Sequence, residues 1–412
     1  MKLIRITTTL LLLGLLWGCQ KESKEDKVSK LVGKWKGIIG LNDGKVDMPF
    51  LFELKKADNE AEVEAYLING ADEELILIDN ITFTGDSLIM PMHIFDAELR
   101  AKVGENGLEG EYVKIGAYGL PFKAEKGTSR FDIGDAPVAN ITGKWKVTFT
   151  KKDGGETPAI GVFKQNDSKV TGTFLTKTGD YRFLEGVIDG KTLKLSTFDG
   201  THAYLFTAEV ADGKITNGQF WSGKTGYRTW EATLDPGVEL PDPTTLTHLK
   251  EGYESLSFSF PNLEGKQVSL EDEKFKDKVV IVQILGSWCP NCMDETKFLA
   301  PFYKQYKDKG VEVIGLGYEN TDDFEVAKKK LERMKKRFDI QYELLYAGQP
   351  SEAAASLPML NHVMSFPTSI IIDRSGKVRQ IHTGFSGPGT GEYYEHFVEE
   401  FTLLIDKLVE EK

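Results

Sequence analysis

The chain has 412 residues, which is long enough for two or three domains that each bury a hydrophobic core. Its composition, with 40% hydrophobic and 28% charged residues, is that of a globular protein, and its 41 glycines favour turn-rich β structure over helical bundles. The formal net charge of −12 argues against a nucleic-acid partner, because binding to phosphates requires a basic surface.

The first 18 residues have the features of a secretory signal peptide. Lys2 and Arg5 precede an apolar stretch, Ile6 to Trp17, that is too short to span a bilayer as a helix. The sequence Leu-Leu-Trp-Gly-Cys that ends at Cys19 resembles a bacterial lipobox, in which the cysteine is acylated and becomes the mature N-terminus; a chance cysteine after an ordinary signal peptide is the alternative. We therefore expect a lipid-anchored protein of the bacterial cell envelope, facing the periplasm or the cell surface, with residues 19–30 as a polar tether.

Residues 31–234 are predicted to be all-β. Apolar and polar residues alternate in short runs such as KWKVTFT, YRFLEGVI and KTLKLSTF. Hairpin turn signals such as NDS and DG separate these runs. In the second part of this region, about eight strands occupy roughly ninety residues, a spacing typical of a small barrel or sandwich.

An internal repeat divides this region in two. The motif Gly-Lys-Trp-Lys occurs at Gly33 and again at Gly143, 110 residues later, and similar strands and turns follow each copy. We therefore predict two tandem β domains, residues 31–127 and 137–235, related by duplication. The G-x-W strand that opens each resembles that of lipocalin-like barrels. Its tryptophan either fills one end of a β core, which is the simpler interpretation, or belongs to a ligand-binding calyx.

The pattern changes after the β region. Three prolines in eight positions indicate a semi-rigid linker at residues 236–252. From residue 253 to 412, buried strands (KVVIVQILG and VEVIGLGY) alternate with amphipathic helices, and a hairpin and a C-terminal helix follow. The seven basic residues between Lys328 and Arg337 are expected to form a solvated helix face rather than an anion site.

Two cysteines, Cys289 and Cys292, form a Cys-x-x-Cys pair at the end of the first of these strands. A disulfide that closes so short a loop contributes little to stability, which favours a reactive role over a structural one. A structural zinc site would need two more ligands, and none of the six histidines forms a spaced pair near either cysteine. We therefore expect neither a metal nor any cofactor other than the redox-active disulfide Cys289–Cys292.

The position of the pair predicts its chemistry. Cys289 falls where a buried strand passes into a helix, and there the free backbone N–H groups and the helix dipole stabilise a thiolate. Pro290 suits the first helical turn, and Cys292 lies one turn further on the same face. Cys289 is therefore expected to attack a substrate disulfide, and Cys292 to resolve the mixed disulfide.

The C-terminal part resembles the TlpA/ResA-like thiol–disulfide oxidoreductases of the thioredoxin superfamily. The resemblance rests on three segments in the expected order, PNLEGKQVSL, KVVIVQILGSWCPNC and FPTSIIIDRSGKV. It implies a thioredoxin-like α/β domain after the all-β half. It also implies an extracytoplasmic protein-disulfide reductase that acts on protein or small thiol and disulfide substrates and uses an unidentified membrane electron donor.

The resemblance assigns roles to individual residues. Pro367 would be a cis proline lying against the cysteine pair, and Trp288, Phe366 and Thr368 would contact substrate.

Proton transfer is assigned in the same way. Glu295 matches a family glutamate that helps to move protons near the pair, but a surface carboxylate in the first helical turn would suit the helix dipole equally well. Gln283 stands where cytosolic thioredoxins carry a buried aspartate and cannot titrate, so protons would pass through Glu295 or through water.

Asn291 departs from the family pattern, because most relatives have proline directly before the second cysteine. The dipeptide between the cysteines influences the redox potential, so a thiol oxidase is an alternative to a reductase. A thiol peroxidase is a further alternative, although the P-x-x-x-[ST] signature is absent before Cys289. An alternative from another class is a ligand- or partner-binding envelope lipoprotein whose thioredoxin-like domain is accessory.

Overall fold

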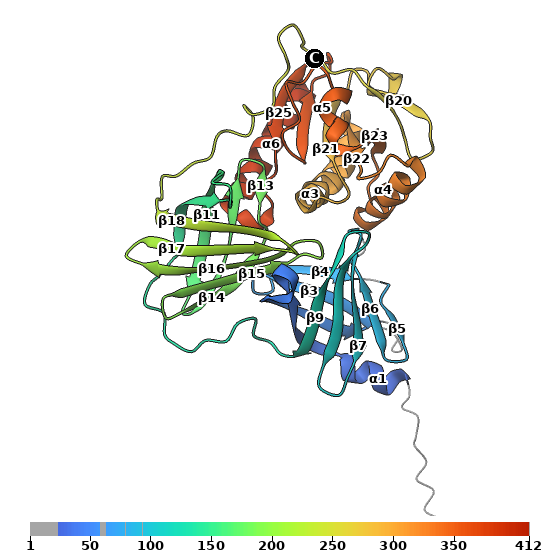
Figure 1. Ribbon diagram of the computed structural model, residues 1–412. Coiled ribbons are helices and arrows are strands. Elements are labelled where there is room, and N and C mark those ends of the chain that lie inside the picture. The colour runs from blue at the N-terminus through green and yellow to red at the C-terminus, as the bar shows by residue number, and fades with distance from the viewer. Residues whose placement is uncertain (1–23, 58–62, 79, 93, 412) are drawn as a thin grey trace, which may run out of the picture.

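The computed structural model describes residues 24–57, 63–78, 80–92 and 94–411. Figure 1 shows a first β domain in blue to teal, a second β domain in green, and an α/β domain in yellow to red. This arrangement confirms the predicted fold class, an all-β half followed by a thioredoxin-like domain. The predicted signal peptide and Cys19 lie outside the described residues. Among the helices of the described segments, none is long and apolar enough to cross a membrane.

The first β domain is an open antiparallel sheet in the order β4-β3-β2-β1-β9-β8-β7-β6-β5, so its first and last strands are neighbours. A helix, α1 (Lys24–Leu31), precedes it, and a single turn, α2 (Leu41–Gly44), joins the first two strands. The strands are β1 (Gly33–Gly40), β2 (Val46–Lys56), β3 (Val63–Asn69), β4 (Glu74–Ile78), β5 (Thr82–Thr84), β6 (Ser87–Pro91), β7 (Ala97–Val103), β8 (Leu108–Lys114) and β9 (Tyr118–Lys126).

The second β domain is a closed barrel. Its antiparallel order is β11-β10-β18-β17-β16-β15-β14-β12-β13, and a further pairing of β11 with β12 closes the sheet. The strands are β10 (Gly143–Thr150), β11 (Glu156–Asn166), β12 (Lys169–Thr176), β13 (Gly179–Asp180), β14 (Leu184–Asp189), β15 (Thr192–Phe198), β16 (Ala203–Ala211), β17 (Lys214–Ser222) and β18 (Gly226–Leu234). The predicted strand YRFLEGVI begins only at Leu184, because the chain turns at Arg182, whose φ is +61°.

The repeated tryptophans occupy equivalent places in the two β domains. Trp35 and Trp145 are both buried, and each indole N–H donates a 2.7 Å hydrogen bond to the carbonyl four residues earlier in the chain. In both domains the tryptophan strand lies between the next strand along the chain and the last strand of the domain. These side chains are core residues, in agreement with the simpler of the two interpretations of the G-x-W motif.

The linker and the α/β domain follow. Residues 236–252 contain no helix or strand apart from an isolated bridge between Leu249 and Leu360. The central sheet has the order β23-β22-β21-β24-β25, in which the first three strands are parallel, β24 runs antiparallel to β21, and β25 runs antiparallel to β24. The strands are β19 (Ser259–Pro261) and β20 (Gln267–Ser269), which form a separate hairpin, and β21 (Val279–Leu285), β22 (Val311–Tyr318), β23 (Glu343–Gly348), β24 (Thr368–Ile372) and β25 (Val378–Thr383).

Helices cover this sheet. They are α3 (Pro290–Tyr306), α4 (Phe324–Phe338), α5 (Ala353–Ser356) and α6 (Glu392–Glu410), with short 3₁₀ turns η1 (Glu273–Phe275), η2 (Lys307–Lys309), η3 (Pro350–Glu352) and η4 (Pro388–Thr390). Every residue of β21 is buried. Because side chains alternate along a strand, Ile281 packs in the cluster that contains α3, α4 and α6, whereas Val282 packs with α5 on the other face. This double burial explains the continuous apolar run.

The basic face of α4 is only partly the solvated face that the sequence suggested, because some of its side chains contact the first β domain. Lys330 and Arg333 form ion pairs with Asp96 of the first β domain, at 2.5 and 3.1 Å, and Arg337 donates a 2.7 Å hydrogen bond to the carbonyl of Leu77. Figure 1 shows α4 next to this domain. The prediction was wrong for these side chains because a charge pattern on a helix does not reveal a neighbouring domain that supplies acceptors.

Candidate active site

The first cysteine of the pair caps the helix that carries the second. β21 ends at Leu285, and after a short turn Cys289 occupies the N-cap of α3, with Pro290 at the first helical position. The backbone N–H of Cys292 donates a 3.2 Å hydrogen bond to the Sγ atom of Cys289. Such a donor and the helix dipole together stabilise negative charge on this sulfur.

The two sulfurs differ in exposure. Both cysteines are free thiols, and Cys289 is 6% exposed whereas Cys292 is completely buried. Burial, reinforced by the hydrogen bond with Cys289, raises the pKa of the Cys292 thiol well above its ordinary value. Cys289 is therefore the sulfur that a substrate can reach, and Cys292 needs a base before it can react as a thiolate.

A cis peptide bond joins Phe366 to Pro367. The segment before this proline lies against the pair, because the thiol of Cys289 donates to the carbonyl of Phe366 at 3.4 Å. The rings of Trp288 and Phe366 are 5.4 Å apart, and the indole N–H of Trp288 donates to the carbonyl of Tyr318 at 2.9 Å. The structure thus brings Trp288 and Phe366 to the reactive sulfur.

Thr368 lies elsewhere. It begins β24, its side chain is completely buried, and its hydroxyl donates to the carbonyl of Ser365 at 2.9 Å. The hydroxyl closes the turn around Pro367 and does not face a substrate, which corrects the substrate contact that the sequence suggested for this side chain. The hydroxyl is not available to a substrate because it forms a hydrogen bond within the tight turn.

Glu295 is buried and not a surface carboxylate. It is 1% exposed, and it accepts hydrogen bonds from the amide of Gln283 at 2.8 Å and the hydroxyl of Ser369 at 2.7 Å. Burial raises its pKa to about 7, although both hydrogen bonds act in the opposite direction. The alternative of an exposed, helix-capping carboxylate is therefore wrong. Glu295 lies one helical turn beyond Cys292 and can exchange a proton near neutral pH.

A second buried carboxylate supports the turn before the pair, and sequence reasoning missed it. Glu319 accepts hydrogen bonds from the backbone N–H and the hydroxyl of Ser287, at 2.8 and 2.7 Å, and its burial raises its pKa. It directly follows the buried strand β22. An acidic residue at the end of a buried parallel strand is the signal that could have found it.

The reactive sulfur opens into a cleft of about 560 Å³ between the α/β domain and the second β domain. The α/β side contributes Trp288, Cys289, Pro290, Asn291 and Phe366. The β side contributes five aromatic rings, here called the aromatic wall, together with Arg228 and small or polar residues. The rings are those of Tyr181, His202, Tyr204, Phe220 and Tyr227, and the other residues are Thr176, Thr178, Gly179, Asp180, Ser222 and Gly226. The sequence did not predict this wall, because its residues lie 60 to 110 positions before Cys289.

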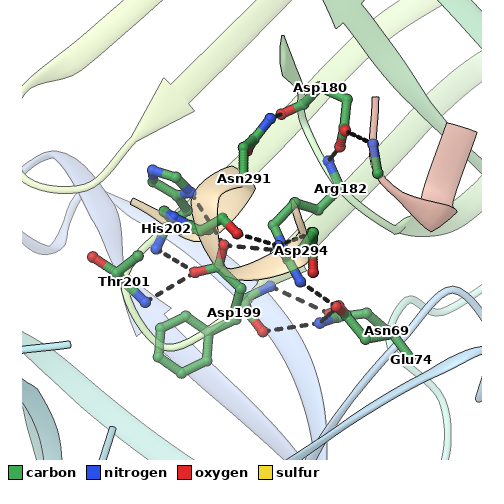
Figure 2. A network of polar contacts seen from close by, with 12 residues as sticks. Asn69, Glu74, Asp180, Arg182, Asp199, Thr201, His202, Asn291 and Asp294 are labelled. Carbon is green, nitrogen blue, oxygen red and sulfur yellow. Dashed lines mark hydrogen bonds and ion pairs between the residues drawn. The ribbon is translucent and has the colours of Figure 1, made fainter. Parts of the chain in front are cut away.

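A buried polar network joins the two sides of the cleft (Figure 2). Arg182 of the second β domain forms ion pairs with Asp294 of α3, with Glu74 of the first β domain and, at 3.5 Å, with Asp199. Its guanidinium also donates to the carbonyl of Pro290 at 3.2 Å. The residue that follows the reactive cysteine is therefore held by a neighbouring domain.

Asn291, inside the Cys-x-x-Cys sequence, is held in the same way. Its amide donates to the carbonyls of Asp180 and Phe385, both at 3.4 Å. The carboxylate of Asp180 accepts a 2.7 Å hydrogen bond from the backbone N–H of Gly387, and burial raises its pKa to about 6. The dipeptide between the cysteines is thus fixed by contacts from both domains.

Metal ligands are not grouped in the part of the chain that the structure describes. Within these residues, no cluster of three or more His, Cys, Asp or Glu side chains could hold a metal ion. The arrangement that is present, a cleft-facing thiol, a buried second thiol and a buried carboxyl group that titrates near neutral pH, suits thiol–disulfide exchange.

Comparisons with related sequences agree with this chemistry. A sequence model of the Redoxin family matches residues 250–395. The thiol-disulfide oxidoreductase ResA of Bacillus thuringiensis subsp. konkukian is 32% identical over 177 residues, which cover 43% of this chain and 84% of that protein. ResA of Bacillus cereus is 33% identical over 151 residues, covering 37% and 78%. A solved thiol-disulfide oxidoreductase from Bacteroides fragilis aligns with a TM-score of 0.29 and 20% identity, covering 36% of this chain and 99% of that one.

Proposed function

Since the chain belongs to the ResA family of thiol-disulfide oxidoreductases through its C-terminal domain, we propose that its Cys289–Cys292 pair reduces disulfides outside the cytosol. The observation that carries this proposal is the asymmetry of the pair. Cys289 lies at a helix N-terminus and faces a cleft, and Cys292 is completely buried behind it. A nucleophile and a resolving thiol need these two environments.

The proposed reaction proceeds in two exchanges. The Cys289 thiolate attacks one sulfur of the substrate disulfide, the substrate S–S bond breaks, and the leaving thiolate takes up a proton. Cys292 then attacks the Sγ atom of Cys289 in the mixed disulfide and releases the second substrate thiol. The substrate gains two electrons and two protons, and the enzyme is left with a Cys289–Cys292 disulfide that an external dithiol must reduce.

Glu295 supplies the base for the second exchange in this proposal. The thiol of Cys292 must lose its proton in a buried site where its pKa is raised well above normal. The carboxyl group of Glu295, with a pKa of about 7, lies one helical turn away and is held by Gln283 and Ser369. A carboxylate with this pKa can accept the proton at neutral pH and return it when the pair is reduced again.

The reducing direction is tested by the equilibrium potential of the pair in the full chain. In glutathione and dithiothreitol redox buffers we expect a value close to thioredoxin at about −270 mV, and far from a strong oxidant at about −120 mV. A value near the oxidant end would overturn the reductase and support a thiol oxidase. The Cys289→Ala variant, which cannot form the disulfide, is the blank for this titration.

We also propose that Cys19 is acylated and anchors the chain to a membrane of the cell envelope, where a membrane electron donor would reach the pair. Support comes from the basic start, the short apolar stretch and the lipobox-like sequence before Cys19. Expressed in a bacterium that processes lipoproteins, the wild type should fractionate with membranes and show an acylated N-terminus by mass spectrometry. The Cys19→Ser variant should be soluble after lysis, and a wild type that remains soluble would contradict the anchor.

A further inference from the structure

We infer that the second β domain selects the substrate of the cysteine pair. In this proposal its aromatic wall and Arg228 bind an extended peptide disulfide that carries an aromatic or aliphatic side chain and a carboxylate beside the reactive cysteine. The inference rests on the proposed function and adds the class of substrate.

The wall is fixed against the pair. The hydroxyl of Ser365 donates to the carbonyl of Thr178 at 2.9 Å, next to the contacts of Asn291 and Arg182 described above. A Cβ atom at Gly179 would lie 2.2 Å from the amide nitrogen of Asn291, so the hairpin around β13 packs directly on the first turn of α3. The two sides of the cleft therefore form one site.

A substrate must meet this wall to reach the sulfur. Cys289 is 6% exposed, and its opening is the cleft whose other side is the second β domain. A group that reaches the Sγ atom through this cleft therefore enters a space lined by Phe366 of the α/β domain and by Tyr204 and Tyr227 of the second β domain. Contacts with the wall are made at the same time as the disulfide is attacked.

The wall presents aromatic faces. The rings of Tyr181, Tyr204 and Phe220 lie 5.3 to 5.6 Å from one another, and the ring of His202 stacks on Tyr204 at 4.8 Å. Tyr227, half-buried near the start of β18, also lines the cleft. Such rings favour apolar and aromatic side chains, which they contact in edge-to-face or offset geometry.

Arg228 adds a positive charge. It lines the cleft, is half-buried and contacts the hydroxyl of Thr157 at 3.4 Å. Among the described residues no carboxylate lies within ion-pair distance of it. A half-buried guanidinium without an acidic partner favours a carboxylate on the ligand.

The size of the cleft and its lining by two domains favour an extended peptide. Its volume of about 560 Å³ lies in the range of small-ligand sites, which is too small for the surface of a folded domain. The residues that line it come from both domains and include Met364 of the α/β domain and Arg228 of the second β domain. A peptide disulfide can contact residues of both domains during the exchange, whereas a small disulfide contacts fewer of them.

The test compares matched substrates. Two disulfide-bridged peptides carry Phe or Ala beside the cysteine, a third replaces a neighbouring Glu by Gln, and bis(2-hydroxyethyl) disulfide serves as the small disulfide. For the full-length wild type we expect kcat/KM for the Phe peptide to exceed that for the Ala peptide by about three- to tenfold, the effect of one aromatic contact with its buried area. The Glu peptide should exceed the Gln peptide, and this difference should shrink at high salt.

Variants of the wall decide the outcome. Tyr227→Ala should abolish the preference for Phe, and Arg228→Gln should abolish the preference for Glu. Thr229→Ala, an exposed neighbour on the same strand, should preserve both preferences. Equal rates for all three peptides with the wild type, or loss of preference in Thr229→Ala as well, would overturn the inference. If Cys289-dependent reduction of bis(2-hydroxyethyl) disulfide is also absent, the proposed function fails together with it.

Discussion

At the scale of single residues, the chemistry of the site depends on how burial shifts the pKa values of its titratable side chains. Glu295 and Cys292 lie one turn apart on α3, and both are enclosed. Enclosure raises the pKa of each group, because the charged form loses hydration. Burial thereby brings the pKa of Glu295 to about 7, whereas Cys292 stays a thiol until a base removes its proton.

Glu295→Gln tests this pairing. Because the variant cannot accept the proton of Cys292, we expect resolution of the mixed disulfide at pH 7.5 to slow by about a hundredfold, the usual contribution of a general base. The measurement is single-turnover release of the second substrate thiol, and Glu399→Gln, an exposed carboxylate on α6, is the control. An unchanged rate of resolution would remove Glu295 from the mechanism.

The pH dependence of stability tests the same group. The pKa of Glu295 in the folded chain is about 7, above the ordinary value of 4.5, so its contribution to stability is complete below about 4.5 and is lost as the pH rises through 7. Glu295→Gln should lack this loss. The denaturant midpoint of the reduced variant should therefore fall less between pH 5 and pH 8 than that of the reduced wild type.

At the scale of elements, the first turn of α3 is enclosed by segments from two domains. Gly179 of the β13 hairpin lies so close to Asn291 that only a residue without a side chain fits, and its φ of +143° also favours glycine. The dipeptide between the cysteines therefore depends on an element of the second β domain, as well as on its own sequence.

Gly179→Ala is the corresponding prediction. The added methyl group must displace Asn291, so we expect a loss of about 1–3 kcal/mol in stability, typical of overpacking, and a shifted potential of the cysteine pair. Gly154→Ala is a matched control, because Gly154 has a φ of +84° in the same barrel and no atom within 4 Å of the added Cβ. Both variants incur backbone strain, but only Gly179→Ala should alter the potential. Equal effects of the two variants on the potential would show that the β13 hairpin does not influence the cysteine pair.

At the scale of the whole molecule, Arg182 connects all three domains. Its partners Glu74, Asp199 and Asp294 come from the first β domain, the second β domain and α3, and all of these side chains are less than 10% exposed. Buried charges of this kind contribute less to stability than to the uniqueness of an arrangement, because desolvation offsets much of their attraction. We therefore assign Arg182 the role of holding the second β domain against the cysteine pair.

Arg182→Met should remove the guanidinium that three buried carboxylates share, leaving Lys297 beside Asp294 and His202 beside Asp199. We expect a destabilisation of about 3–5 kcal/mol, as when one partner of a buried ion pair is removed, and faster hydrogen exchange in the first turn of α3 and around Glu74. Arg100→Met removes an exposed ion pair with Glu98 and should cost about 0–1 kcal/mol. Unchanged exchange in α3 of the Arg182 variant would show that the domains are held by other contacts.

The amino-acid sequence by itself determined the local features of this protein. The period-two runs and turn residues predicted the all-β half, the apolar run of β21 predicted a buried strand, and the Cys-x-x-Cys after it predicted a thiol at a helix N-terminus. These features depend on neighbours within a few residues, so periodicity and capping residues reveal them.

Only the tertiary structure decided the surroundings of the pair. The contact of buried Glu295 with Ser369, the docking of the basic face of α4 on Asp96 and the contacts of Arg182 with Asp294 and Pro290 join residues 74 to 237 positions apart. Pairings over such separations depend on which surfaces meet after each domain has folded, and charge or polarity in a local segment does not specify the partner. The position of the aromatic wall in the cleft of Cys289 was also decided only by the tertiary structure.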